Sequence, residues 1–267
     1  MARYTMLMNR LWLNLLLPLC LWLCSQPVRA QKGNAAQNRP RVGLVLSGGG
    51  AKGAAHIGVI RAVEQAGIPI DYIAGTSMGA IVGGLYAMGY TTDELEQLVK
   101  MQDWEMLLSD KSPRKQLSPE QRERKGRYIL NIPLSRSAKP KMDGFVRGRN
   151  LGNMLARLTV GYHDSISFDS LHIPFACVAT NLANGDEVVL RSGKLSAAIR
   201  ASMAIPGVFT PVVMEGKTLV DGGLCNNFPV DVARRMGADI VIGSTVQRVF
   251  NDTMQQGGIQ SVVQQLI

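Results

Sequence analysis

The pattern Gly-Thr-Ser-Met-Gly at residues 75–79 restricts the fold of this chain more than any other feature of its sequence. It follows a short apolar run, 72–76, that predicts a strand, and it opens a run of small and apolar residues, 78–88, that predicts a helix. A serine at such a junction is typical of a sharp strand-to-helix turn that exposes its side chain. Gly75 and Gly79 fit that turn, because they lack the Cβ atoms that would collide in so tight a bend.

Strands and helices are predicted to alternate along most of the chain. Short apolar runs predict further strands at residues 41–47, 174–180, 187–190, 217–220 and 239–244. Apolar residues at helical spacing predict helices at residues 54–66, 151–160, 194–202, 230–236 and 257–267, and a helix that ends at Met101 after a capping segment at 90–93. This order favours an α/β fold of three layers, in which helices cover both faces of a mainly parallel central sheet.

The first thirty residues resemble a secretory signal peptide in composition. Arg3 and Arg10 precede an apolar run at 11–24, and a short segment that ends at Ala30 follows this run. The run is shorter than the roughly 20 residues that a membrane-spanning helix needs, and Pro18 interrupts it. We therefore expect export to the periplasm, the outer membrane or the medium, with an uncleaved anchor as the alternative.

Residues 31–41 are polar and lack periodicity, so we expect a linker before a compact domain over residues 42–235. Residues 236–267 would complete that domain with a strand and a helix. Cleavage of the signal peptide would leave Cys177 and Cys225, which we expect to be buried free thiols. Two cysteines make no disulfide framework, and no metal site is expected.

Residues 111–149 concentrate positive charge in a chain whose formal net charge is +9. Twelve Lys and Arg residues stand against three acidic residues here, and four prolines limit regular structure to one expected strand at 128–132. Such a segment either contacts anionic lipid headgroups or is a solvated loop without a partner. The sequence leaves both interpretations open.

Ser77 is the candidate nucleophile, because the turn would point the amino end of the following helix at its oxygen, where negative charge is stabilised. An ordinary serine in a tight turn is the alternative. A second glycine cluster, 48–53, follows the first predicted strand and can direct several backbone N–H groups towards one oxyanion or phosphate. In a parallel sheet both turns lie at the carboxyl ends of their strands, so we expect them to form one site.

Gly48, Gly50 and Gly53 also satisfy the G-x-G-x-x-G pattern of dinucleotide-binding proteins. That class needs an acidic residue at the end of the second strand, about 20 residues further on, to bind the ribose. Ser77 stands there instead, and no Gly-Lys-Ser/Thr of a phosphate-binding loop follows. A dinucleotide-binding protein is therefore the weaker alternative.

Asp221 is the candidate base. The chain has three histidines, His56, His163 and His172, and none follows Asp221, so the Ser–Asp–His order of α/β-hydrolases fails. Asp221 ends a predicted strand and precedes two glycines, where its carboxylate could accept the serine proton directly. Burial against apolar neighbours would make it a stronger base. An ordinary Asp-Gly turn is the alternative.

At these motifs the sequence resembles the patatin-like phospholipase family over about residues 42–235. GGGAKG at 48–53 is similar to the oxyanion loop of that family, and GTSMG at 75–79 is similar to its nucleophile turn. DGG at 221–223 is similar to its catalytic aspartate motif. Further matches are His56, SMAIPGVFTP at 202–211 and Asn-Asn-Phe-Pro at 226–229.

The resemblance implies a patatin-like fold and hydrolysis of fatty-acyl esters, as by phospholipase A, without calcium or another cofactor. Ser77 would attack the ester carbonyl, Asp221 would take its proton, and water would release the fatty acid from the acyl-enzyme. The implied oxyanion hole comprises Gly48, Gly49, Gly50 and Ala51. The other implied motif residues are Gly53, Gly75, Gly79, Gly222 and Gly223. At Asn181 many relatives have Asp, and we assign this residue no role.

A lipid or phospholipid is thus the expected partner, and a nucleic acid is not. One alternative is a hydrolase of small esters or thioesters that uses the same site, and a comparison of short-chain with long-chain esters would separate the two. Another is a non-catalytic lipid-binding module, which a fluorophosphonate would not label.

Overall fold

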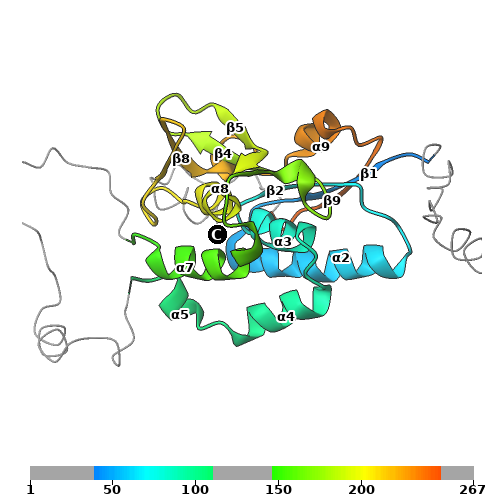
Figure 1. Cartoon of the computed structure of the whole chain (residues 1–267), viewed down its shortest axis with the longest axis horizontal. Coiled ribbons are helices and arrows are strands. Elements are labelled where there is room, and N and C mark those ends of the chain that lie inside the picture. Colours follow the sequence, from blue (N-terminus) through cyan, green and yellow to red (C-terminus); the bar gives the residue numbers. More distant parts are fainter. Residues whose placement is uncertain (1–38, 111–145, 248–267) are drawn as a thin grey trace, which may run out of the picture. The chain divides into compact units, whose positions relative to one another are not determined.

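The computed structural model describes residues 39–110 and 146–247, which form an α/β structure around one central sheet (Figure 1). Within these residues the sheet has seven strands. Successive members of the series β7-β8-β4-β2-β1-β9 are hydrogen-bonded to each other, and β5 also pairs with β4. They are β1 (Val42–Leu46), β2 (Tyr72–Thr76), β4 (Phe175–Asn181), β5 (Glu187–Leu190), β7 (Val212–Met214), β8 (Lys217–Asp221) and β9 (Ile240–Ser244). The two-residue strands β3 (Ile166–Ser167) and β6 (Ser192–Gly193) form a separate pair.

The expected α/β fold is confirmed. The helices are α2 (His56–Gln65), α3 (Met78–Ala87), α4 (Thr92–Met101), α5 (Trp104–Leu107), α7 (Arg149–Leu158), α8 (Leu195–Ser202) and α9 (Val230–Met236). Short 3₁₀ turns are η2 (Gly50–Ala55), η4 (Val160–Tyr162), η5 (Phe168–Ser170) and η6 (Gly222–Leu224). In Figure 1, α9 lies on one side of the strands, and α2, α3 and α7 lie on the other.

Alternating side chains of the central strands build a core on each face of the sheet. Leu44, Ile73 and Phe175 belong to the larger core, which includes residues of α2, α3 and α8. Val45 and Ala74 point the other way and belong to the smaller core under α9. Because helices cover both faces, all five residues of β1 are buried.

The sheet is mixed, with its parallel part in the centre. β1 pairs in parallel with β2 and β9, and β2 pairs in parallel with β4. β5 and β8 are antiparallel to β4, and β7 is antiparallel to β8. The β7–β8 connection is a two-residue hairpin turn in which Glu215 and Gly216 both have positive φ, a geometry that suits the twist of adjacent strands.

The strands and helices expected within the described residues occur within about two residues of their predicted bounds. The cap of α4 is also present, since Thr91 and Glu94 form reciprocal side-chain to backbone hydrogen bonds. The short elements α5, β3, β6 and β7 were not predicted, because two to four residues carry too little periodicity. The signal peptide, most of the linker, the strand at 128–132, the basic segment up to residue 145 and the helix at 257–267 lie outside the described residues. In the described ranges no helix has the length and apolar character to cross a membrane.

Candidate active site

Ser77 forms the turn between β2 and α3 with a backbone φ of 53° and ψ of −118°. A residue with a side chain rarely adopts this conformation, and the surrounding structure must hold it. A Cβ on Gly79 would lie 2.3 Å from the carbonyl oxygen of Leu46, and one on Gly75 would lie 2.5 Å from that of Gly79. Gly79 therefore lets the turn pack against the end of β1, and Gly75 lets the start of α3 lie close against the end of β2.

Strand β4 pairs with three strands, and the register shows which of them share an edge. β2 pairs with residues 175–178 of β4, β8 with residues 179–181 and β5 with residues 177–180. Since β5 overlaps both other ranges, it must occupy the opposite edge. β2 and β8 therefore follow one another along a single edge of β4. They run towards each other, because β2 is parallel and β8 antiparallel to β4.

The carboxyl ends of β2 and β8 meet along β4, and this brings the candidate pair together. Thr76 is paired with Val178, and Asp221 is paired with the next residue of β4. Ser77 follows Thr76, and its hydroxyl donates a hydrogen bond to Oδ2 of Asp221 at 2.7 Å. Ser77 is 6% exposed and Asp221 is 2% exposed. A buried carboxylate thus contacts the serine hydroxyl directly, with no histidine between them.

The environment of Asp221 suits a proton acceptor. Burial raises the pKa of its carboxyl to about 6, against the opposing effect of hydrogen bonds from the Gly223 N–H and the Ser77 hydroxyl. The Gly223 nitrogen lies 2.7 Å from Oδ1, so both carboxylate oxygens are held. A Cβ on Gly222 would lie 2.2 Å from the carbonyl oxygen of Val178, so glycine lets β8 end tightly against β4. A carboxylate of this pKa is ionised at neutral pH and more basic than an exposed aspartate.

The glycine loop lies against the same pair. A Cβ on Gly48 would lie 3.2 Å from Cβ of Ser77, and one on Gly53 would lie 2.4 Å from Cγ of Met78. The lack of side chains at these glycines lets the loop approach the nucleophile turn. The two glycine motifs therefore meet at one place in the structure, as their positions after parallel strands predicted.

The backbone N–H groups expected to bind the oxyanion are not all free to do so. The N–H of Gly48 donates to the carbonyl oxygen of Asn227 at 3.1 Å, so this group is not free to bind an oxyanion in this conformation. That is a departure from the expectation for Gly48. Gly50, with φ 54°, begins a 3₁₀ turn whose first N–H groups have no acceptor within the turn. The N–H groups of Gly49, Gly50 and Ala51 remain the candidate donors.

None of the three histidines takes part in the hydrogen bond between Ser77 and Asp221. His56 is fully buried, and its Nε2–H donates to the carbonyl oxygen of Ser47 at 2.8 Å. Burial lowers the pKa of the ring, which favours the neutral form in which Nδ1 accepts from the Ser244 hydroxyl at 2.7 Å. His56 therefore ties the ends of β1 and β9 together. His163 and His172 are exposed.

Two residues that sequence reasoning did not single out contact the site. The Ser202 hydroxyl accepts a hydrogen bond from the Ser77 N–H at 3.0 Å and donates one to the Val178 carbonyl at 2.6 Å. Asn227 supplies the carbonyl that holds Gly48. Both lie in segments that resemble the patatin-like family, and that likeness was the only signal for them.

Cys177 is buried and free, as expected, but Cys225 is free and exposed. The expectation for Cys225 was wrong because the residue follows the η6 turn and not a core strand. Within the described part of the chain, no group of three or more His, Cys, Asp or Glu side chains is placed to hold a metal ion.

Comparison with known proteins identifies the family of this fold. A family model described as patatin-like phospholipase matches residues 44–234. The chain belongs to the patatin-like phospholipase family. A patatin-like phospholipase domain-containing protein of Caenorhabditis elegans is 34% identical over 236 residues, which cover 88% of this chain and 15% of the worm protein. An uncharacterised NTE family protein of Mycobacterium tuberculosis is 37% identical over 203 residues, which cover 76% and 48% respectively.

Lysophospholipase NTE1 of Mycosarcoma maydis is 34% identical over 220 residues, which cover 80% of this patatin-like chain and 10% of the fungal protein. The chain thus spans less than half the length of these three curated relatives. The crystal structure of VipD from Legionella pneumophila has a TM-score of 0.49 and 20% identity, and the match covers 85% of this chain and 52% of VipD. That last likeness concerns the fold alone.

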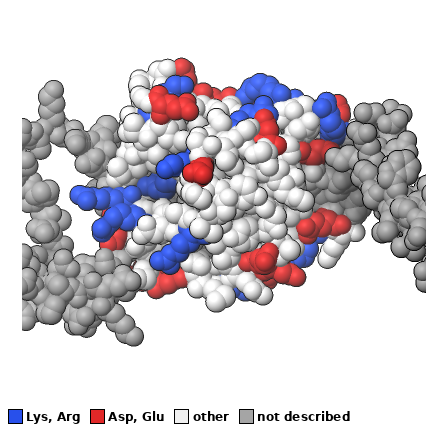
Figure 2. Space-filling model, in the orientation of Figure 1, with Lys and Arg blue, Asp and Glu red and all other residues white. Residues whose placement is uncertain are grey.

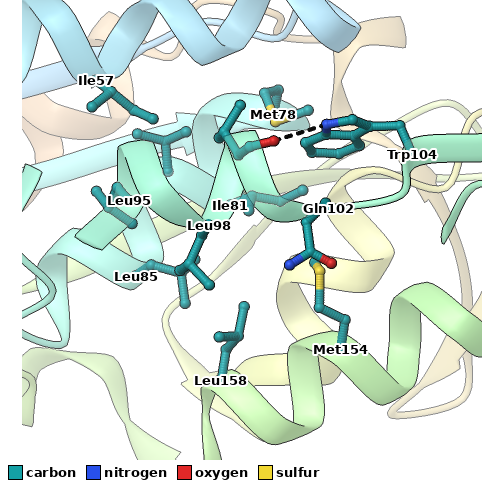
Figure 3. A pocket seen from close by; sticks show the side chains of 12 residues that line it. Ile57, Met78, Ile81, Leu85, Leu95, Leu98, Gln102, Trp104, Met154 and Leu158 are labelled. Atoms are coloured by element: carbon teal, nitrogen blue, oxygen red, sulfur yellow. Dashed lines mark hydrogen bonds between the residues drawn. The ribbon is translucent and has the colours of Figure 1, made fainter. Parts of the chain in front are cut away.

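An apolar pocket of the patatin-like chain lies along α3 (Figure 3). Met78, which follows Ser77, lines it together with Ile81 and Leu85 from the same face of α3. This face extends the lining about 10 Å along the helix axis, at 1.5 Å per residue. Further residues of α2, α3, α4, α5, α7 and the α4–α5 connection complete it: Ile57, Val82, Leu95, Leu98, Val99, Gln102, Trp104, Met154 and Leu158.

Charged side chains are unevenly spread over the face shown in Figure 2. Lys and Arg gather at the left end of that face, near the start of α7. Here Asp110 accepts hydrogen bonds from the backbone N–H groups of Arg147 and Arg149, and so caps the amino end of α7. Of the basic segment 111–149, only residues 146–149 lie among the described residues.

Proposed function

We propose that this patatin-like chain hydrolyses fatty-acyl esters of lipids through a Ser77–Asp221 pair. The observation that carries the proposal is the 2.7 Å hydrogen bond from the Ser77 hydroxyl to the buried Asp221 carboxylate. Membership of the patatin-like phospholipase family supports lipid ester hydrolysis as the reaction class. The position of the pair, between a glycine loop and an apolar pocket, supports an acyl ester as the substrate.

In the proposed reaction the Ser77 oxygen attacks the ester carbonyl carbon while its proton passes to Oδ2 of Asp221. The carbonyl oxygen gains negative charge, and the N–H groups of Gly49, Gly50 and Ala51 stabilise it. The tetrahedral intermediate collapses as the protonated Asp221 gives its proton to the leaving alcohol, and this leaves an acyl-enzyme. Asp221 then takes a proton from water, whose oxygen attacks the acyl carbon, and returns that proton to the Ser77 oxygen as the fatty acid leaves.

The acyl chain would lie in the pocket along α3. Its lining includes Met78, the residue that follows Ser77, which supports this pocket as the site for a chain attached to the Ser77 oxygen. Gln102 and the indole of Trp104 are the polar groups in the lining, and the indole N–H already donates to the carbonyl of Val99 at 3.0 Å (Figure 3). A mainly apolar lining whose indole N–H is already hydrogen-bonded suits a hydrocarbon chain.

The variant Met154→Trp tests this assignment by filling the pocket from α7. We expect it to lower kcat/KM for long-chain esters about tenfold more than for short-chain esters, because the larger side chain removes space that only a long chain needs. The comparison of p-nitrophenyl butyrate with p-nitrophenyl palmitate measures this. Asn153→Trp is the control, since Asn153 is exposed on the same helix and does not line the pocket. An equal effect of Met154→Trp on both esters would contradict the assignment.

Product analysis on mixed phospholipids and lysophospholipids tests the proposed reaction itself. Lysophospholipids are included because one relative bears the name lysophospholipase. We expect fatty acids to be released by the wild-type protein and not by Ser77→Ala or Asp221→Asn. Cleavage of short esters or thioesters alone would favour the alternative substrate class, and release by both variants would contradict the Ser–Asp pair.

Export and contact with membranes are proposals that rest on the sequence. If residues 111–149 bind anionic headgroups, binding to anionic vesicles should weaken as salt is added, because ions screen the attraction. Equal binding to neutral vesicles at every salt concentration would contradict it. Export predicts that the protein recovered outside the cytoplasm begins at Gln31.

A further inference from the structure

We propose that residues Ser202–Ala204, the last residue of helix α8 and the two residues after it, form a clamp that fixes the distance between Ser77 and Asp221. We call this segment the α8 clamp. It holds the backbone of both members of the pair from one short stretch of chain. The inference extends the proposed function and rests on it, because it assigns Ser202 as a positioning residue for that reaction.

The α8 clamp contacts each member of the pair through a backbone N–H. The Ser202 hydroxyl accepts from the Ser77 N–H at 3.0 Å, and the carbonyl of Ala204 accepts from the Asp221 N–H at 2.9 Å. The Ser202 hydroxyl also donates to the carbonyl of Val178 at 2.6 Å, which anchors it to β4. Ser202 and Ala204 are both fully buried, so water cannot replace these bonds at low cost.

The Ser202 hydroxyl bridges two backbone groups at the point where the pairing of β2 with β4 ends. At Ser77 the chain leaves β2, and the next position along the edge of β4 is taken by Asp221 at the end of β8. The Ser77 N–H and the Val178 carbonyl therefore have no strand partner at this junction. A hydroxyl can accept from one and donate to the other, whereas an alanine side chain can do neither. The two strand ends are thus joined through Ser202.

Loss of the Ser202 hydroxyl should loosen the nucleophile turn. The turn holds Ser77 at positive φ, and the bond to Ser202 restrains its backbone directly. Without it, the Ser77 oxygen is free to move away from Oδ2 of Asp221. The substrate pocket lies along α3 and would remain, so the chemical step should suffer more than substrate binding.

The test compares wild-type protein with Ser202→Ala. We expect kcat to fall by about 10- to 100-fold with KM little changed, the size of effect that small misplacements of catalytic groups produce. A second readout needs no substrate: the carbon-13 shift of the Asp221 carboxyl against pH, assigned with Asp221→Asn. Its pKa should rise in Ser202→Ala, because the Ser77 hydroxyl stabilises the charged carboxylate. Within the described residues only burial, the Gly223 N–H and the Ser77 hydroxyl shift that pKa, and no charged side chain does.

Thr159→Ala is the matched control. The Thr159 hydroxyl is equally buried and donates to the carbonyl of Leu155 on α7, away from the pair. It should lower thermal stability without moving kcat or the pKa of Asp221. If Ser202→Ala does not fold, Ser202→Cys is tested instead, because it retains the shape and a weaker donor; its kcat should be lower, and the pKa of Asp221 higher, than in wild type.

One result would overturn the α8 clamp: a Ser202 variant that loses stability while kcat and the Asp221 titration stay as in wild type, which is the behaviour expected of Thr159→Ala. Failure of the proposed function looks different. In that case the wild-type protein would release no fatty acid from any ester, while the titration would still report whether Ser202 holds Ser77 against Asp221.

Discussion

Ser77→Ala is expected to abolish fatty-acid release, with a loss of about 10³-fold or more, and to prevent labelling by a fluorophosphonate. The nucleophile is the one group that forms the covalent bond to the substrate, so no neighbour can replace it. Alanine retains the Cβ, and the positive φ at this position strains alanine and serine alike. The fold should therefore persist, and the loss is chemical.

The measurement is single-turnover labelling and product release on the same protein sample, with circular dichroism as the test of folding. Ser170→Ala is the control: Ser170 is exposed, and its hydroxyl donates within its own turn to the carbonyl of Ser167. It should be labelled and active as wild type is. A Ser77→Ala protein that remains active would refute the assigned nucleophile.

Asp221→Asn is expected to lower kcat by about 10²- to 10⁴-fold, the range that loss of a general base produces. An asparagine oxygen can still accept from the Gly223 N–H, which now bonds to Oδ1. Its amide would donate to Ser77 where the carboxylate accepted, so the hydroxyl proton has no acceptor. KM should change little, since Asp221 is absent from the pocket lining.

The pH dependence of kcat/KM of the wild-type protein should also report Asp221 as the base. Because burial raises the pKa of Asp221 to about 6, its base form is lost as the pH falls below that value. We expect kcat/KM to drop by about tenfold per pH unit in the acid range and to level off above neutral pH. A profile that stays flat down to pH 4 would contradict a base with this pKa.

The same carboxyl should make Asp221→Asn more stable than wild type. Its pKa is higher in the folded protein than in the unfolded chain, so its contribution to stability is present below about pH 4 and lost as the pH rises to about 6. At pH 8 the ionised buried group therefore lowers the free energy of unfolding, by on the order of 1–3 kcal/mol. Asparagine carries no charge and removes this destabilisation, so the stability that Asp221→Asn gains over wild type should decrease towards pH 4. Urea unfolding at pH 4.5 and pH 8 measures the difference.

Asp164→Asn is the control for both measurements, because the Asp164 side chain is largely exposed at 85%. It should leave activity and the pH dependence of unfolding as in wild type. If Asp221→Asn and wild type unfold with the same pH dependence, burial does not raise the pKa of this carboxyl, and the proposed base loses its physical support.

The local elements of this protein could be predicted because their causes are local. Short apolar runs followed by glycine turns and helical periodicity gave the strands and helices of the described residues within about two residues. The turn at Ser77 was readable for the same reason, since only glycines fit at positions 75 and 79. Elements of two to four residues, such as β7 and α5, carried no such pattern and were missed.

The sequence by itself determined which groups are available: a serine in a strained turn, a glycine loop, and an aspartate at the end of a strand with no histidine after it. Only the tertiary structure decided how they are joined. Hydrogen bonds between distant segments bring β2 and β8 together along one edge of β4. Such bonds also join Ser202 to Ser77 and the Gly48 N–H to the carbonyl of Asn227. Periodicity describes neighbours along the chain, whereas these bonds form between neighbours in space.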